Sequence, residues 1–103
     1  MIESIANNSE AIKALCERYR VKRLEVFGSA SNASGFDPRT SDIDLLVEFL
    51  PLREGEYADA YFDLLEALEQ LFHRHVDLVM PRAIKNRYFL ESIDRTRKLL
   101  YAA

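Results

Sequence analysis

The chain has 103 residues, 49% apolar and 30% charged, a balance that excludes intrinsic disorder and leaves room for one small core, so we expect a single domain over residues 1–103. Its single cysteine, Cys16, excludes an internal disulfide framework, and no apolar run approaches the ~20 residues of a membrane span. With a net charge of −3 and an acidic start that does not resemble a signal peptide, we expect a cytoplasmic protein with no membrane partner and no direct nucleic-acid binding.

The first half of the chain predicts one helix and one strand. After the capping cluster Asn7-Asn8-Ser9, apolar side chains recur at helical spacing and predict a helix over residues 9–19, with Cys16 on its buried stripe. Residues 21–27 are typical of a strand that ends at Gly28. Residues 28–41 are rich in small and polar residues, which predicts a loop with room for one short helical turn.

The second half predicts strands and helices in alternation. In residues 41–49 the apolar Ile43, Leu45 and Val47 alternate with Asp42, Asp44 and Leu46, which predicts a strand. Residues 57–72 carry a strong amphipathic helical pattern, and residues 76–80 predict a short strand closed by Pro81. Residues 82–95 are typical of a helix, and the last residues, 99–101, fit either helix or a short edge strand.

This order indicates an α/β (α+β) fold, a small mixed sheet of three or four strands with helices packed on one face. We expect both long helices to bury their apolar stripes on the same face, because 103 residues cannot cover two. The opposite face is then available for chemistry.

Three carboxylates point to that face. Asp42 and Asp44 are two residues apart on a predicted strand, so their side chains share one face while Ile43 faces the core. Asp77 lies in a similar setting on the next predicted strand. Converging carboxylates repel one another unless a cation lies between them, and Mg²⁺ prefers such hard oxygen ligands. We therefore predict Asp42, Asp44 and Asp77 to be catalytic metal ligands suited to two-metal phosphoryl transfer.

Gly28 and Ser29 follow a strand directly. Glycine allows close approach of the backbone to a phosphate, and the serine hydroxyl and nearby amides can donate hydrogen bonds to it. Upstream of the acidic strand, this pair is a candidate triphosphate-binding turn. His73 and His75 share a face if extended, but no cysteine or acid follows at ligand spacing, so we interpret them as an exposed helix end.

Charge is distributed unevenly along the chain. Residues 81–103 carry six basic and two acidic side chains, a balance of +4, which leaves −7 for residues 1–80. The basic end could hold a polyphosphate or dock on an acidic partner, or it could be a solvated helix face.

The segment Leu24-Glu25-Val26-Phe27-Gly28-Ser29, followed after a gap by Asp42-Ile43-Asp44-Leu45, resembles the signature of polymerase-beta-like nucleotidyltransferases. The later Val76-Asp77-Leu78-Val79 is similar to the third-acid strand of their minimal members. The chain most resembles the MNT-type proteins, the antitoxins of HEPN/MNT toxin–antitoxin pairs. This resemblance implies transfer of AMP from ATP, with Mg²⁺, onto a tyrosine of a cognate HEPN toxin. It also implies that Gly28 and Ser29 bind nucleotide and that Asp42, Asp44 and Asp77 bind metal.

One departure from that pattern stands out. Many members have an arginine soon after Gly-Ser, whereas residues 30–35 of this chain contain no basic residue. Arg39, Lys85 or Arg87 are candidates to replace it. The alternative to an enzyme is therefore an antitoxin that neutralises its partner by binding alone. RNA tailing or antibiotic modification ranks last, since residues 81–103 are too short for a further substrate-binding domain.

Overall fold

The computed structural model describes residues 1–32, 35–37 and 39–103, so residues 33–34 and 38 of the expected 28–41 loop lie outside the described residues. The elements follow the predicted alternation of helices and strands. In chain order they are α1 (Glu3–Ala6), α2 (Ser9–Arg18), β1 (Val21–Phe27), α3 (Ser29–Asn32), β2 (Ile43–Phe49), α4 (Glu56–Phe72), β3 (Val76–Val79), the 3-10 turn η1 (Pro81–Ala83), α5 (Arg87–Thr96) and β4 (Lys98–Ala102).

The four strands form one mixed sheet in the order β3-β2-β1-β4. Strand β1 pairs antiparallel with both β2 and β4, while β2 and β3 run parallel. A parallel pair needs a long crossover connection, and α4 supplies it. The predicted mixed sheet is therefore confirmed, with β4 as its fourth strand.

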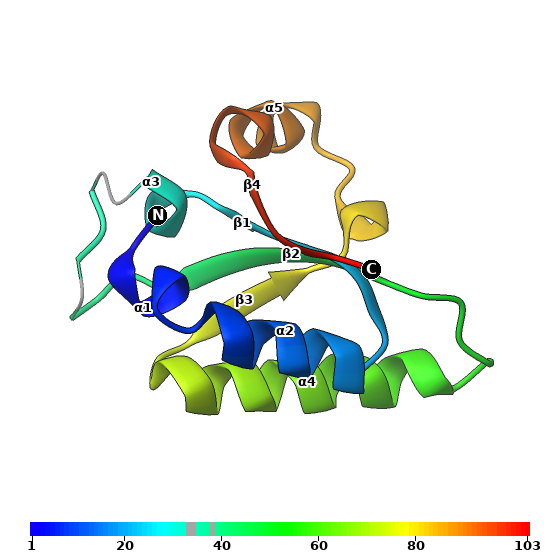
Figure 1. Cartoon of the computed structure of the whole chain (residues 1–103). Helices are drawn as coiled ribbons and strands as arrows, with labels where there is room; N and C mark the ends of the chain where they lie inside the picture. The colour runs from blue at the N-terminus through cyan, green and yellow to red at the C-terminus, as the bar shows by residue number, and fades with distance from the viewer. Residues whose placement is uncertain (33–34, 38) are drawn as a thin grey trace.

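The main core lies between the sheet and the two long helices. Figure 1 shows α2 and α4 side by side on one face of the sheet. Their buried stripes, which include Ile12, Cys16, Leu64 and Leu68, meet the alternate strand residues that point to this face. The expectation that both long helices share one face is correct, and Cys16 is a core residue as predicted.

A smaller cluster lies on the opposite face. Ile93 of α5 packs against Phe27 of β1 and Leu46 of β2, with Val79 and Ile84 at the margin. In Figure 1, α5 lies across the sheet from α2 and α4. The expectation that the helices cover one face thus fails for α5, because Ile93 finds apolar partners in Phe27 and Leu46 on the opposite face of the sheet.

The structure also shifts two predicted boundaries. The helix expected over residues 82–95 begins at Arg87, because the Asn86 side chain accepts hydrogen bonds from the backbone N–H groups of Tyr88 and Phe89 and caps it there. The first short helix, α1, was not predicted, and its four residues are too few for a helical period to show. None of the described helices is long and apolar enough to cross a bilayer.

Candidate active site

The sheet register places three side chains in a row across neighbouring strands. Phe27 pairs with Asp44, and Asp44 pairs with Asp77. All three lie on the face that α5 partly covers, because their neighbours Val26, Leu45 and Leu78 belong to the main core on the other face. The prediction that the acids lie on the sheet face opposite the long helices is therefore confirmed for Asp44 and Asp77.

Asp42 lies one residue before β2. The backbone next to it is held by Arg74, which lies before β3. The Arg74 guanidinium donates a 3.1 Å hydrogen bond to the carbonyl of Ser41 and stacks on the ring of Phe36 at 5.0 Å. Arg74 thus connects the segment before β3 to the segment before β2. This contact fixes the backbone from which the Asp42 carboxylate extends.

His75 lies between two of the three acids. Its Nδ1 atom is 3.2 Å from Oδ2 of Asp42 and 3.8 Å from Oδ1 of Asp77. One ligand atom from each of these three residues lies within 4.8 Å of the other two. His73 is an exposed residue at the end of α4, as predicted, whereas the exposed His75 lies beyond the helix beside two acids that the ligand spacing did not reveal, because one of them, Asp42, is distant in sequence.

The carboxyl of Asp44 shows the electrostatic cost of this convergence. Its partial burial, a hydrogen bond shared with Asp77, and the charges of Asp77 and Asp42 together raise its pKa to about 6, against which nearby His75 acts weakly. A carboxyl with a raised pKa is one whose negative charge is not fully compensated. A cation placed among these groups would remove that cost.

Gly28 lies directly against the acidic strand. Its backbone has a φ of +71°, and a β-carbon at this position would lie 2.8 Å from Oδ2 of Asp44. Only glycine fits this left-handed turn without strain or a clash with the carboxylate. The Gly28 N–H already donates a 2.8 Å hydrogen bond to Oγ1 of Thr96. The role of Gly28 is therefore to leave space beside the Asp44 carboxylate, and its amide is not free to bind a ligand.

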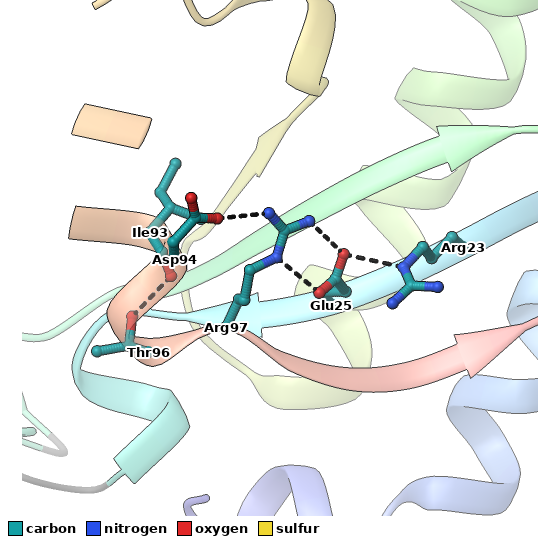
Figure 2. A network of polar contacts seen from close by, with 6 residues as sticks. All are labelled: Arg23, Glu25, Ile93, Asp94, Thr96 and Arg97. Carbon is teal, nitrogen blue, oxygen red and sulfur yellow. Dashed lines mark hydrogen bonds and ion pairs between the residues drawn. The ribbon is translucent and has the colours of Figure 1, made fainter. Parts of the chain in front are cut away.

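A network of charged side chains anchors the strand that leads into Gly28. Figure 2 shows Glu25 of β1 between Arg23 and Arg97, with Arg97 also bound to Asp94 at the end of α5. Glu25 is only 5% exposed, and its pKa is lowered first by the hydrogen bonds from Arg97 and also by those from Arg23. The network ties the α5–β4 junction, including Thr96, to the strand beside the site.

Ser29 opens the short helix α3 beside Gly28. The cations considered for the missing arginine, Arg39, Lys85 and Arg87, are all exposed. A lysine that the sequence did not single out contacts the helix that follows this turn, since Lys98 Nζ donates a 2.9 Å hydrogen bond to the carbonyl of Ser31 in α3. Lys98 comes from the edge strand β4, which explains why its position in the chain gave no indication of this contact.

A cavity of about 520 Å³ borders the acids. Asp44, His75 and Asp77 line it on one side, and Tyr61 of α4 and Phe89 of α5 line it elsewhere. The Phe89 ring meets Phe27 edge to face with centroids 6.1 Å apart. The acids therefore open into a cavity with aromatic walls, the usual composition of a small-molecule site.

Comparison with known proteins identifies the family. Residues 9–100 match the model of the nucleotidyltransferase domain. The protein adenylyltransferase MntA of Thermococcus cleftensis is 38% identical over 85 residues, which cover 82% of this chain and 79% of that protein. A structure assigned to a minimal nucleotidyltransferase is 34% identical, covers 93% of this chain and 92% of that one, and superposes with a TM-score of 0.71.

A complex from Shewanella oneidensis, described as a tri-AMPylated HEPN toxin with its MNT antitoxin, contains a chain of the same fold. The match has 21% identity and a TM-score of 0.63, and covers 96% of this chain and 73% of that one. At this identity the likeness shows the fold alone. The more similar relatives confirm the resemblance found around Gly28-Ser29 and Asp42-Ile43-Asp44, and the chain belongs to the nucleotidyltransferase family as a minimal, MNT-type member.

Proposed function

We propose that this chain transfers AMP from ATP to a tyrosine hydroxyl of a cognate HEPN-type toxin and so acts as an antitoxin. The observation that carries the proposal is the convergence of Asp42, Asp44 and Asp77 beside the Gly28 turn, on a face that opens into a cavity. The naming of a relative with 38% identity as a protein adenylyltransferase supports the same reaction. We place the reaction in the cytoplasm, where ATP is available. The single domain of residues 1–103 would carry it out.

The residues present fit a divalent cation. The donors are carboxylate oxygens, which Mg²⁺ prefers, and the pKa of Asp44 is raised first by burial and then by its hydrogen bond with Asp77 and the charges of Asp77 and Asp42. Asp42, Asp44 and Asp77 would hold Mg²⁺. When bound, Mg²⁺ supplies charge neutralisation for the triphosphate and for the pyrophosphate that leaves.

The chain's own residues would bind and orient the triphosphate and accept a proton from the acceptor hydroxyl. Gly28 lets the turn lie directly against the Asp44 carboxylate. The backbone of this turn would approach the triphosphate, and the Ser29 hydroxyl would donate to a phosphate oxygen. The acceptor oxygen forms a bond to the α-phosphorus while the bond to the β-phosphate oxygen breaks and pyrophosphate departs. Asp77, half of whose side chain is exposed, faces the solvent side from which an acceptor hydroxyl arrives and takes up its proton.

The acceptor protein would approach past α5. Tyr88 is 73% exposed and Phe89 43% exposed, and Phe89 also lines the cavity beside the acids. Aromatic side chains of this kind supply much of the energy of protein interfaces. A partner bound here would hold its hydroxyl group near Asp77.

A second candidate function is neutralisation by binding alone. It is favoured by the absence of a basic residue directly after Gly28-Ser29 and by the same exposed aromatic side chains of α5. In this case the acids would be dispensable for neutralisation. The two candidates therefore differ in whether Asp42 and Asp44 are needed.

The deciding experiment measures the intact mass of the protein encoded next to this chain. That protein is incubated with Mg²⁺ and ATP, together with either the wild-type chain or a variant carrying both Asp42→Asn and Asp44→Asn. We expect a gain of one or more AMP units with the wild type and none with the variant. Peptide mapping then locates the modified residue and tests the tyrosine assignment.

A matched control replaces Glu48, an acid on the same strand and the same face but four residues beyond Asp44, by glutamine. This variant should transfer AMP like the wild type. A stable complex with no mass gain for any variant would favour neutralisation by binding. Loss of the fold in the metal-free Asp42→Asn or Asp44→Asn chain would instead assign these residues a structural role.

A further inference from the structure

His75 occupies a position that the sequence pattern of three acids does not include. Its Nδ1 atom lies 3.2 Å from a carboxylate oxygen of Asp42 and 3.8 Å from one of Asp77. Adjacent ligands of one small divalent ion, with bonds of about 2.1 Å, lie about 3 Å apart. The imidazole nitrogen is thus close to the separation from Asp42 that two ligands of the same ion would have.

The backbone holds the imidazole in this place. The Ile43 N–H donates a 3.2 Å hydrogen bond to the carbonyl of His75, which extends the parallel pairing of β2 and β3 by one step. His75 therefore lies beside Asp42 for the same reason that Asp77 lies beside Asp44. Its side chain also lines the cavity that contains the acids.

Nitrogen and oxygen donors do not favour the same ions. Carboxylates and water suit both Mg²⁺ and Mn²⁺, whereas an imidazole nitrogen binds divalent transition ions better than it binds Mg²⁺, with Mn²⁺ the weakest of that series and Cu²⁺ the strongest. We propose that His75 supplies an imidazole nitrogen to the cation site of Asp42 and Asp77 and so shifts the preference of that site from Mg²⁺ towards Mn²⁺. This inference rests on the proposed function, because it requires the metal site.

The competing interpretation is a simple hydrogen bond. In that case the Nδ1–H donates to Asp42 whether or not an ion is bound, and His75 only orients the carboxylate. Glutamine can retain such a hydrogen bond but is a poor substitute for a nitrogen ligand. The pair His75→Gln and His75→Ala therefore separates ligation from orientation.

The test measures binding of Mn²⁺ alone to the full 103-residue chain by electron paramagnetic resonance, with Mg²⁺ affinity obtained by competition. Electron spin echo of the Mn²⁺ complex reports directly on a bound ¹⁴N atom. Asp42→Asn tests the site itself, and His73→Asn is the matched control. His73 is an exposed histidine two residues away with a φ of 54°, a conformation that asparagine tolerates.

We expect imidazole ¹⁴N modulation in the wild type and in His73→Asn, and its loss in both His75 variants. Mn²⁺ affinity should fall about tenfold in His75→Gln while Mg²⁺ affinity changes less than about twofold. Unchanged Mn²⁺ affinity in His75→Gln, with binding abolished by Asp42→Asn, would overturn the role of His75 and leave the proposed site intact. Binding that survives Asp42→Asn, or no Mn²⁺ binding by the wild type, would overturn both.

Discussion

Replacing Asp44 by asparagine is expected to stabilise the metal-free protein at pH 7. Burial, with the hydrogen bond and charge of Asp77, raises the pKa of Asp44 from its ordinary value of 3.8 to about 6. This difference sets an upper limit of about 3 kcal/mol on the penalty for keeping the carboxylate charged. Because the side chain is only half-buried, solvent screening reduces the expected gain to about 1 kcal/mol.

The pH dependence follows from the direction of that change. A carboxyl whose folded-state pKa is raised binds more protons in the folded than in the unfolded chain. Its penalty is therefore absent below pH 3.8 and complete above about pH 6. The wild type should lose stability relative to Asp44→Asn as the pH rises between these values. Asparagine resembles the protonated carboxyl and can still donate a hydrogen bond to Asp77.

The assay is urea unfolding followed by circular dichroism at pH 4, 5 and 7 in the presence of a chelator. Asp44→Asn should be about as stable as the wild type at pH 4 and more stable at pH 7. Added Mg²⁺ should then reverse the order, because only the wild type gains free energy from binding the ion. Glu48→Gln, on the same strand, serves as the control and should follow the wild type under all conditions.

The reasoning would be refuted by a variant that is less stable than the wild type at pH 7 without metal. That result would mean that the Asp44 carboxylate makes hydrogen bonds that the fold needs, and that these outweigh the cost of burying its charge beside Asp77.

Three further changes test the surroundings of the site. Gly28→Ala should lower the free energy of unfolding by roughly 1–2 kcal/mol, measured in urea, because its backbone has a φ of +71° and the new β-carbon would meet Asp44 at 2.8 Å. Arg97→Ala should cost about 2 kcal/mol at pH 7, because buried Glu25 loses its strongest partner. This cost should shrink below pH 4.5, the ordinary pKa of the glutamate, because the folded-state pKa of Glu25 is lower and its contribution is lost as the pH falls through it. Cys16, fully buried with its pKa raised to about 12, should add no mass from iodoacetamide when folded and one adduct after unfolding.

Local pattern was sufficient for most of the elements. Alternating apolar residues marked β2, and the helical spacing of leucines marked α4, because both periods are fixed by backbone geometry. The same period of two placed Asp42 and Asp44 on one face. The boundary of α5 was missed because it depends on the Asn86 cap, a contact that a helical period does not reveal.

Contacts between distant segments had no local signal. Lys98 reaches α3 only because β4 pairs with β1, and Thr96 reaches the Gly28 amide for the same reason. Glu25 is a charged residue on a strand, yet it is buried, because Arg97 at the end of α5 donates hydrogen bonds to its carboxylate. Each of these contacts exists because β4, the last strand of the chain, and the end of α5 lie beside β1.

The sequence by itself indicated the candidate site, two acids at one strand and a third on the next strand of the chain, preceded by a Gly-Ser turn, because side-chain direction along a strand needs no tertiary information. Only the tertiary structure decided that His75 joins those acids. The reason is physical: β2 and β3 pair in parallel across the whole of α4, and the Ile43 N–H can reach the His75 carbonyl only once that crossover has closed.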